Sequence, residues 1–220
     1  MQNPIRILST KKLLSNQKKF LLNAGFSVIE CDFIEIKNKE FELDQINDNL
    51  IFTSGNAFAS FLENEGSRDF IKKSIFCVGL KTRELIANNG FKVVESEDNA
   101  SQLSEKIKQY KGESFTFFSG NMRLETLPAS LKIAEIRFNE IEVYETVLSS
   151  IEIKTTVDGI LFFSPSAVKS YLQQNKIISE ICFCIGTTTA EALQNITPNI
   201  IIAKQPSVEN TIIQCINFYK

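Results

Sequence analysis

The sequence predicts an α/β protein with two similar parallel-sheet domains, the second inserted in the first. Short apolar runs alternate with helix-forming stretches along all 220 residues, which is typical of parallel sheets with helices on their faces. Two strand–turn–helix motifs recur in the same order about half a chain later, which indicates a duplicated unit. Two extended segments, 33–37 and 143–147, also lie about 110 residues apart.

The first repeated motif is Cys182–Leu193, which echoes Ile75–Ile86. Each begins with an apolar run, turns at a glycine and continues into good helix formers. Free N–H groups and a partial positive charge at a helix start favour anions, and threonine hydroxyls there cap the helix or bind an anion. Plain capping without a ligand is the alternative. The matched positions are Gly79 with Gly186 and Thr82 with Thr189.

The second repeated motif pairs Ile51–Ala57 with Leu161–Ala167. Ser54 and Ser164 occupy equivalent places, each between a buried strand and a helix. Chance similarity among α/β strands is the alternative, but two motifs in one order favour duplication.

Composition restricts the classes of function. The formal net charge is −2, which argues against a nucleic-acid or membrane surface. The chain has no histidine, which excludes Ser-His-Asp and Cys-His catalysis and every histidine metal site. Chemistry must therefore use carboxylates, tyrosine, lysine, hydroxyls or the backbone.

Cysteines and apolar runs indicate the compartment. Five cysteines without CxxC spacing predict buried free thiols in a reducing environment. The opening Met1-Gln2-Asn3-Pro4 lacks the long apolar core of a signal peptide, and no apolar run approaches the length of a membrane span. We therefore expect a cytoplasmic protein with no membrane or nucleic-acid partner.

In the first half, helices are expected after turn or cap signals and before glycine or asparagine. Gly25 and Gly90 are such ends. The expected helices are 12–24, a short one within 37–49, 57–64, 82–89 and 101–110. The expected strands are 5–9, 26–36, 50–54, 75–78, 93–94 and 115–118.

In the second half, a helix over 124–132 is broken or restarted at Pro128, and an alternating strand follows over 134–143. The remaining elements are strands 159–163, 181–185 and 200–202 and helices 166–174, 189–194 and 208–218. In parallel sheets, ligands bind beyond the carboxyl ends of the strands. The residues expected at that edge are Ser54, Gly79, Ser119, Ser164 and Gly186.

The repeat also predicts the domain boundaries. If the chain crosses between domains at both extended segments, one domain is 34–146 and the other is 1–33 plus 147–220. We expect two flavodoxin-like domains joined by a two-strand hinge that permits relative motion.

Over nearly its whole length the chain resembles the uroporphyrinogen-III synthases. Each supporting segment is short, and their order and spacing carry the resemblance. The segments are Ile51–Ser54, Val78–Thr82, Ser119–Pro128, Val143–Thr146, Phe163–Ala167 and Ile185–Leu193.

The resemblance implies a lyase of tetrapyrrole and haem biosynthesis that acts as a monomer, with neither metal nor organic cofactor. Its substrate would be hydroxymethylbilane, a linear tetrapyrrole with eight carboxylates. The enzyme would remove the terminal hydroxyl as water and close the ring with inversion of ring D. Such a bilane ionises readily, so the task is mainly positional catalysis with modest acid assistance, which suits a chain without histidine.

The resemblance also assigns roles to residues. Tyr144, in the Val-Tyr-x-Thr motif, would assist loss of the hydroxyl; a hinge-packing tyrosine is the alternative. Arg123 would pair with a substrate carboxylate, or else remain a solvated surface arginine. The other positions expected to bind substrate, through hydroxyls, backbone donors or close approach, are Ser54, Gly79, Thr82, Gly120, Asn121, Ser164, Ser166, Gly186, Thr188 and Thr189.

Two other functions stay open. A bilobed α/β chain with a hinge is also the plan of small-anion binding proteins, although the expected cytoplasmic location argues against it. The chain could also be a family member that has lost catalysis.

Overall fold

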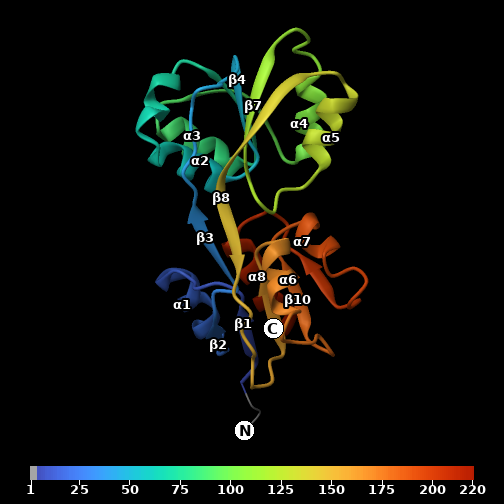
Figure 1. The fold of residues 1–220 in the computed structure, drawn as a ribbon. Coiled ribbons are helices and arrows are strands. Elements are labelled where there is room, and N and C mark those ends of the chain that lie inside the picture. Colours follow the sequence, from blue (N-terminus) through green and yellow to red (C-terminus); the bar gives the residue numbers. More distant parts are fainter. Residues whose placement is uncertain (1–3) are drawn as a thin grey trace. The chain divides into compact units, whose positions relative to one another are not determined.

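The computed structural model describes residues 4–220; the opening residues used above to argue against a signal peptide lie partly outside that range. The chain divides into two compact units. Unit 1 contains the chain as far as Glu35 together with Val147–Lys220, and unit 2 contains Ile36–Thr146. The chain leaves unit 1 within β3 (Ile34–Asn38) and returns within β8 (Arg137–Leu148), and these strands are neighbours in a sheet (Figure 1).

Unit 1 is built on a five-stranded sheet in the order β11-β10-β9-β1-β2, and every strand pair in it is parallel. Its strands are β1 (Arg6–Ser9), β2 (Ser27–Glu30), β9 (Gly159–Phe162), β10 (Ile181–Cys184) and β11 (Ile200–Ile202). Its helices are α1 (Ser15–Asn23), α6 (Pro165–Tyr171), α7 (Thr187–Glu191) and α8 (Val208–Tyr219).

The strands of unit 1 are apolar on both faces, as a doubly covered parallel sheet requires. Along β9, Ile160 packs with residues of α6 and α7, whereas Leu161 packs with residues of α1 and α8. The same alternation holds in β10, where Cys182 and Phe183 belong to opposite faces. Two helices therefore cover each face.

Unit 2 is built on a six-stranded sheet in the order β3-β8-β7-β4-β5-β6. The pairs β8-β7, β7-β4, β4-β5 and β5-β6 are parallel. Its remaining strands are β4 (Asn49–Phe52), β5 (Ser74–Val78), β6 (Lys92–Glu97) and β7 (Ser114–Gly120). Its helices are α2 (Gly55–Glu63), the 3-10 helix η1 (Glu65–Phe70), α3 (Leu80–Asn88), α4 (Ala100–Ile107) and α5 (Thr126–Ile133).

One face of the unit 2 sheet is unusually aromatic. Phe52 stacks on Phe118 at 5.0 Å between ring centroids, and Phe61 approaches Phe118 at 4.9 Å. Phe58 and Phe91 extend this cluster beneath α2 and α3. The other face packs under α4 and α5. This packing fixes the carboxyl ends of β4 and β7, directly before the residues that follow each strand.

The two sheets correspond when their strands are matched through the sequence repeat. Strands β4, β5 and β6 of unit 2 correspond to β9, β10 and β11 of unit 1, and β7 and β8 correspond to β1 and β2. In unit 1, the amino-terminal strands β1 and β2 therefore occupy the positions that β7 and β8 occupy in unit 2. Each sheet has one place at which the strand order reverses. This place lies between β4 and β7 in unit 2 and between β9 and β1 in unit 1. Ligands bind at such switch points in open α/β sheets.

The structure corrects the expected helix within 37–49. This segment is extended as far as Asn38 and is irregular up to β4. Phe41, Leu43 and Ile46 pack against the aromatic core. The Asn47 amide donates to the Phe115 carbonyl at 2.7 Å. These irregularly spaced contacts compete with a helix.

The expected strand 26–36 is in fact two strands, β2 and β3, that belong to different sheets. The chain breaks at Cys31–Phe33, where Phe33 turns into the core of unit 1. Strand β8 begins at Arg137, later than the expected 134, because Ala134 is the C-cap of α5 and Glu135 follows it in a left-handed conformation with φ of 56°. The helix η1 was not expected.

Within residues 4–220, no helix has the length and apolar character needed to cross a bilayer.

Candidate functional site

In unit 2, the switch point brings Ser54, Gly120 and Tyr144 together. Ser54 follows β4 and is the N-cap of α2. Gly120 is the last residue of β7, and Tyr144 lies beside it on β8. All three were expected at the site from the sequence, but their mutual contact was not.

The Tyr144 ring lies directly over Gly120. A Cβ atom built on Gly120 would be 2.3 Å from Cζ of Tyr144 and closer than 3 Å to both neighbouring ring carbons. Any side chain at this position would therefore displace the ring. The need for glycine here comes from this close approach and was not visible in the sequence.

The Tyr144 hydroxyl donates to Oγ of Ser54 across 3.4 Å, which is long for a bond between hydroxyls. Oγ of Ser54 also accepts from the Asn56 N–H at 3.1 Å. Because Oγ of Ser54 accepts both hydrogen bonds, the hydroxyl proton of Ser54 points away from the Tyr144 hydroxyl and the Asn56 N–H. The long contact leaves the Tyr144 hydroxyl able to turn toward a ligand at little energetic cost.

Asn121 was expected to offer a backbone donor to substrate, but its N–H donates to the Tyr144 carbonyl at 3.3 Å. Its side chain pairs with the backbone of Thr146: Oδ1 accepts from the N–H at 2.8 Å, and Nδ2 donates to the carbonyl at 3.4 Å. Asn121 thus extends the ladder between β7 and β8 beyond the end of β7.

Arg123 was expected to pair with substrate, but in this structure it is held by carboxylates of its own chain. It makes a bidentate ion pair with Glu140, in which Nη2 donates to Oε2 at 2.8 Å. It makes a second ion pair with Glu125 at 2.5 Å. Ser119 donates to the same Glu140 at 2.6 Å. Arg123 therefore fixes the end of β7 to β8.

The pKa of Glu140 predicts a pH dependence of stability. Burial raises this pKa, but hydrogen bonds from Arg123 and Ser119 outweigh burial and leave it lowered. A lowered folded-state pKa stabilises the fold above the unfolded value of about 4.3, and the contribution is lost as pH falls through the folded value. We expect Glu140→Gln to reduce the free energy of unfolding by about 1 kcal/mol at pH 7. The urea-unfolding free energies of the two proteins should converge as pH falls through the lowered folded-state pKa of Glu140; a difference independent of pH would contradict this.

Helix α3 starts at the same edge and has no cap from a side chain among the described residues. Gly79 is its N-cap, with φ of 88°, and a Cβ there would come no closer than 4.0 Å to Oγ1 of Thr82. Thr82 is buried in the first turn. The first N–H groups of α3 are therefore left without a side-chain acceptor, which favours an anion.

Unit 1 repeats this arrangement around its own switch point. Ser164 caps α6 by accepting from the Ala167 N–H at 3.1 Å, and its Oγ lies 2.9 Å from Oγ of Ser166. Helix α7 begins after Gly186 and, within the described chain, receives no side-chain cap. Thr189 is buried in its first turn, whereas Thr188 is exposed.

The two glycines differ in backbone conformation, and this gives a paired prediction. Gly79 has φ of 88°, which an L-residue reaches only with strain, whereas Gly186 is extended and a Cβ there meets nothing within 4 Å. We expect Gly79→Ala to lower the free energy of unfolding by about 1–2 kcal/mol and Gly186→Ala to leave it nearly unchanged. Urea unfolding measures both; equal effects would show that the backbone at Gly79 adapts.

The structure adds Lys11 to the expected residues of unit 1. Lys11 follows β1 at the switch point, and its Nζ lies 6.0 Å from the centre of the Phe163 ring, next to Ser164. Thr10 anchors this turn by donating to the Leu161 carbonyl at 2.8 Å. The signal in the sequence was a run of Thr10, Lys11 and Lys12 directly after a predicted strand.

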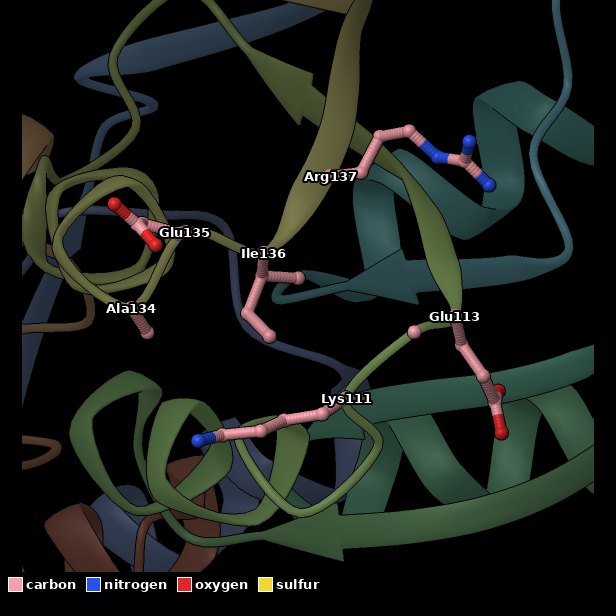
Figure 2. Close-up of a pocket in the computed structure, with 7 residues that line it drawn as sticks. Lys111, Glu113, Ala134, Glu135, Ile136 and Arg137 are labelled. Carbon is pink, nitrogen blue, oxygen red and sulfur yellow. The ribbon is translucent and has the colours of Figure 1, made fainter.

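A cavity elsewhere in unit 2 does not form a competing site. A cavity of about 400 Å³ lies at the opposite edge of unit 2, where β7 and β8 begin, and is lined by Lys111, Glu113, Glu135 and Arg137 among others. Figure 2 shows that these charged side chains point in different directions and do not converge. Within the described residues, no cluster of three or more histidine, cysteine, aspartate or glutamate side chains could hold a metal.

The buried cysteines are also unsuited to catalysis. All five are free thiols, and Cys77, Cys182 and Cys184 are buried as expected. Burial raises the pKa of Cys182 and of Cys184 to about 12, so neither supplies a thiolate near neutral pH.

Taken together, the two units define an α/β protein that presents hydroxyls and uncapped helix starts at the carboxyl edges of two related sheets. The family model described as Uroporphyrinogen-III synthase HemD matches residues 16–213. The chain belongs to the uroporphyrinogen-III synthase family, a family of lyases in tetrapyrrole biosynthesis, which confirms the resemblance found in the sequence.

Solved structures of the family share the fold. The uroporphyrinogen-III synthetase of Helicobacter pylori matches with a TM-score of 0.73 and 21% identity, covering 97% of this chain and 99% of that chain. A triple mutant of the Thermus thermophilus synthase matches with a TM-score of 0.71 and 14% identity, covering 97% and 98%. The predicted fold class is thereby confirmed. No curated protein matches the chain in sequence.

Proposed function

We propose that the chain converts hydroxymethylbilane to uroporphyrinogen III by loss of water, ring closure and inversion of ring D. In a chain of this family, the observation that carries the proposal is the seating of the Tyr144 hydroxyl beside Ser54 at the switch point of unit 2. A histidine-free chain has few other groups that can polarise a leaving hydroxyl.

Binding an octa-anion with a chain of net charge −2 requires donors that carry no net charge. Helix α3 has nine residues. Its first turn, which follows Gly79 and contains Thr82, has no side-chain cap among the described residues. Its N–H groups and the positive end of the helix dipole suit a carboxylate. Ser54 offers a hydroxyl proton at the neighbouring strand end.

We assign a similar binding role to unit 1. Its candidates are Ser164, Ser166, Gly186, Thr188 and Thr189, with Lys11 as the additional cation. A substrate with carboxylates on every pyrrole would bind through matching positions in both repeats. Arg123 and Asn121 are assigned to support of β8, because their polar groups are engaged within the chain.

In the proposed reaction the protein has little bond chemistry to perform. The Tyr144 hydroxyl donates to the leaving oxygen and lowers the barrier to its departure. The reactive carbocation-like pyrrole that remains is held so that the substituted carbon of ring D attacks it. For ring D to be inverted, the bond between that carbon and its original bridging methylene then breaks, and the methylene forms a new bond to the free carbon of ring D. The proton lost from that free carbon balances the departed hydroxide as water. Most of the acceleration is then positional, with a smaller part from acid assistance.

We infer a monomer in the cytoplasm as the working form. Five free thiols, four of them buried, fit a reducing compartment.

The decisive test is incubation of the purified protein with freshly made hydroxymethylbilane, followed by separation of the I and III isomers. We expect isomer III to form faster than isomer I forms without protein. Isomer I alone, at the uncatalysed rate, would contradict the proposal. Tight binding of the bilane without conversion would instead identify a binding protein or a family member that has lost catalysis.

A further inference from the structure

We propose that Asn121 is a positioning residue that, with Gly120, holds a bulge in β8 and thereby keeps Tyr144 on the catalytic side of the sheet. The catalytic importance of Tyr144 rests on the proposed function; its positioning does not.

The bulge is visible in the strand register. Ser119 pairs with Glu142, but the next residue, Gly120, pairs with Tyr144, so Val143 is an extra residue on β8. Such a bulge redirects the side chains that follow it.

The redirection changes the face on which Tyr144 lies. In a regular strand, neighbouring residues point to opposite faces. Here Val143 and Tyr144 both pack against the aromatic core under α2 and α3, together with Ile141. If β8 alternated regularly through Val143, without the bulge, Tyr144 would share the opposite face with Phe138, which packs in the core under α4 and α5. The hydroxyl would then lie on the wrong side of the sheet for Ser54.

Asn121 binds the chain on both sides of this redirected residue. Its backbone N–H donates to the Tyr144 carbonyl at 3.3 Å, and its amide oxygen accepts from the Thr146 N–H at 2.8 Å. Because β7 ends at Gly120, no further residue of that strand would make these bonds. Gly120 supplies the space for the ring, and Asn121 supplies the bonds that retain the bulge.

Unit 1 offers a matched control. The Asn175 side chain makes the same kind of pair with backbone: its Oδ1 accepts from the Ile153 N–H at 2.8 Å, and its Nδ2 donates to the Ile151 carbonyl at 2.7 Å. Asn175→Ala therefore removes this pair, together with a further bond from Nδ2 to the Tyr171 carbonyl at 2.9 Å, without touching β8. Asn121→Asp is the conservative variant, because a carboxylate oxygen still accepts from Thr146.

The first measurement is independent of activity. The chain has four tyrosines and no tryptophan, so protein labelled with 3-fluorotyrosine gives four fluorine resonances, and Tyr144→Phe identifies one. We expect that resonance to shift or broaden in Asn121→Ala, to stay in place in Asn175→Ala, and to return toward its original position in Asn121→Asp. An unmoved resonance in Asn121→Ala overturns the positioning role, whatever the protein catalyses.

The second measurement is the rate of formation of isomer III. We expect Asn121→Ala to lower kcat about 10-fold with KM nearly unchanged. Misplacing a catalytic group by an ångström can cost about 100-fold, and the loss is bounded by the contribution of the Tyr144 hydroxyl, about 10-fold to 100-fold. The loss should not add to that of Tyr144→Phe in the double variant, since both act through one hydroxyl. Full additivity overturns the proposal. If Asn121→Ala does not fold, Asn121→Ser removes the same amide pair and is judged by the same two criteria.

Discussion

Replacing Tyr144 with phenylalanine should lower the rate of isomer III formation by about 10-fold to 100-fold without loss of the fold. General acid assistance typically contributes about 10²–10⁴-fold. The lower part of that range, or less, applies here because the bilane ionises easily. The ring itself should stay over Gly120, since phenylalanine has the same shape and the hydroxyl makes only one long contact, to Ser54.

Tyr110→Phe is the matched control for Tyr144→Phe. It removes a tyrosine hydroxyl of the same unit that donates to Glu95 at 2.8 Å, and we expect no loss of rate. The residual product of Tyr144→Phe should still be isomer III, because folding of the bilane depends on other groups. Thr189→Ala, measured alongside, tests whether the threonines bind carboxylates, through a raised KM.

Three results would change the assignment. An unchanged rate in Tyr144→Phe removes this residue from the mechanism. A change of product from isomer III to isomer I would mean that Tyr144 orients ring D and does not assist loss of water. An equal loss in Tyr110→Phe would point to a general effect on the stability of unit 2.

The repeat motifs predicted most of the fold because they are local signals. A buried apolar run ending at Gly79 or Ser54 defines a strand, a turn and a helix start within about ten residues. Where the local pattern was weak, tertiary contacts decided. The segment that contains Phe41, Leu43 and Ile46 is extended because its apolar residues pack on the aromatic core, and no periodicity reveals this in advance.

The sequence predicted candidate site residues but not the contacts between them. Gly120, Asn121 and Arg123 were predicted because the segment Ser119–Pro128 resembles the family. All three were assigned to substrate, whereas Arg123 pairs with Glu140 and Asn121 with the backbone of β8. A bulge depends on the register between two strands that are distant in the sequence, and this register cannot be read from either strand alone.

The aromatic core of unit 2 gives the largest expected effect on stability. Phe118 is fully buried on β7 and contacts the rings of Phe52, Phe61 and Phe41 at 5.0, 4.9 and 6.3 Å between centroids. Phe118→Ala removes these contacts and leaves a cavity that the sheet cannot close. We expect a loss of about 3–5 kcal/mol in the free energy of unfolding.

Urea unfolding followed by circular dichroism measures this loss, and the midpoint should fall by about 1–3 M. If the two units unfold in separate transitions, only that of unit 2 should move. Phe20→Ala is the matched control, because Phe20 is 53% exposed and its loss should change stability by less than about 0.5 kcal/mol. An effect of Phe118→Ala below about 1 kcal/mol would mean that the neighbouring rings collapse into the space. Since Gly120 lies two residues beyond Phe118, such a collapse would also move the ring of Tyr144, and the activity of the variant would report it.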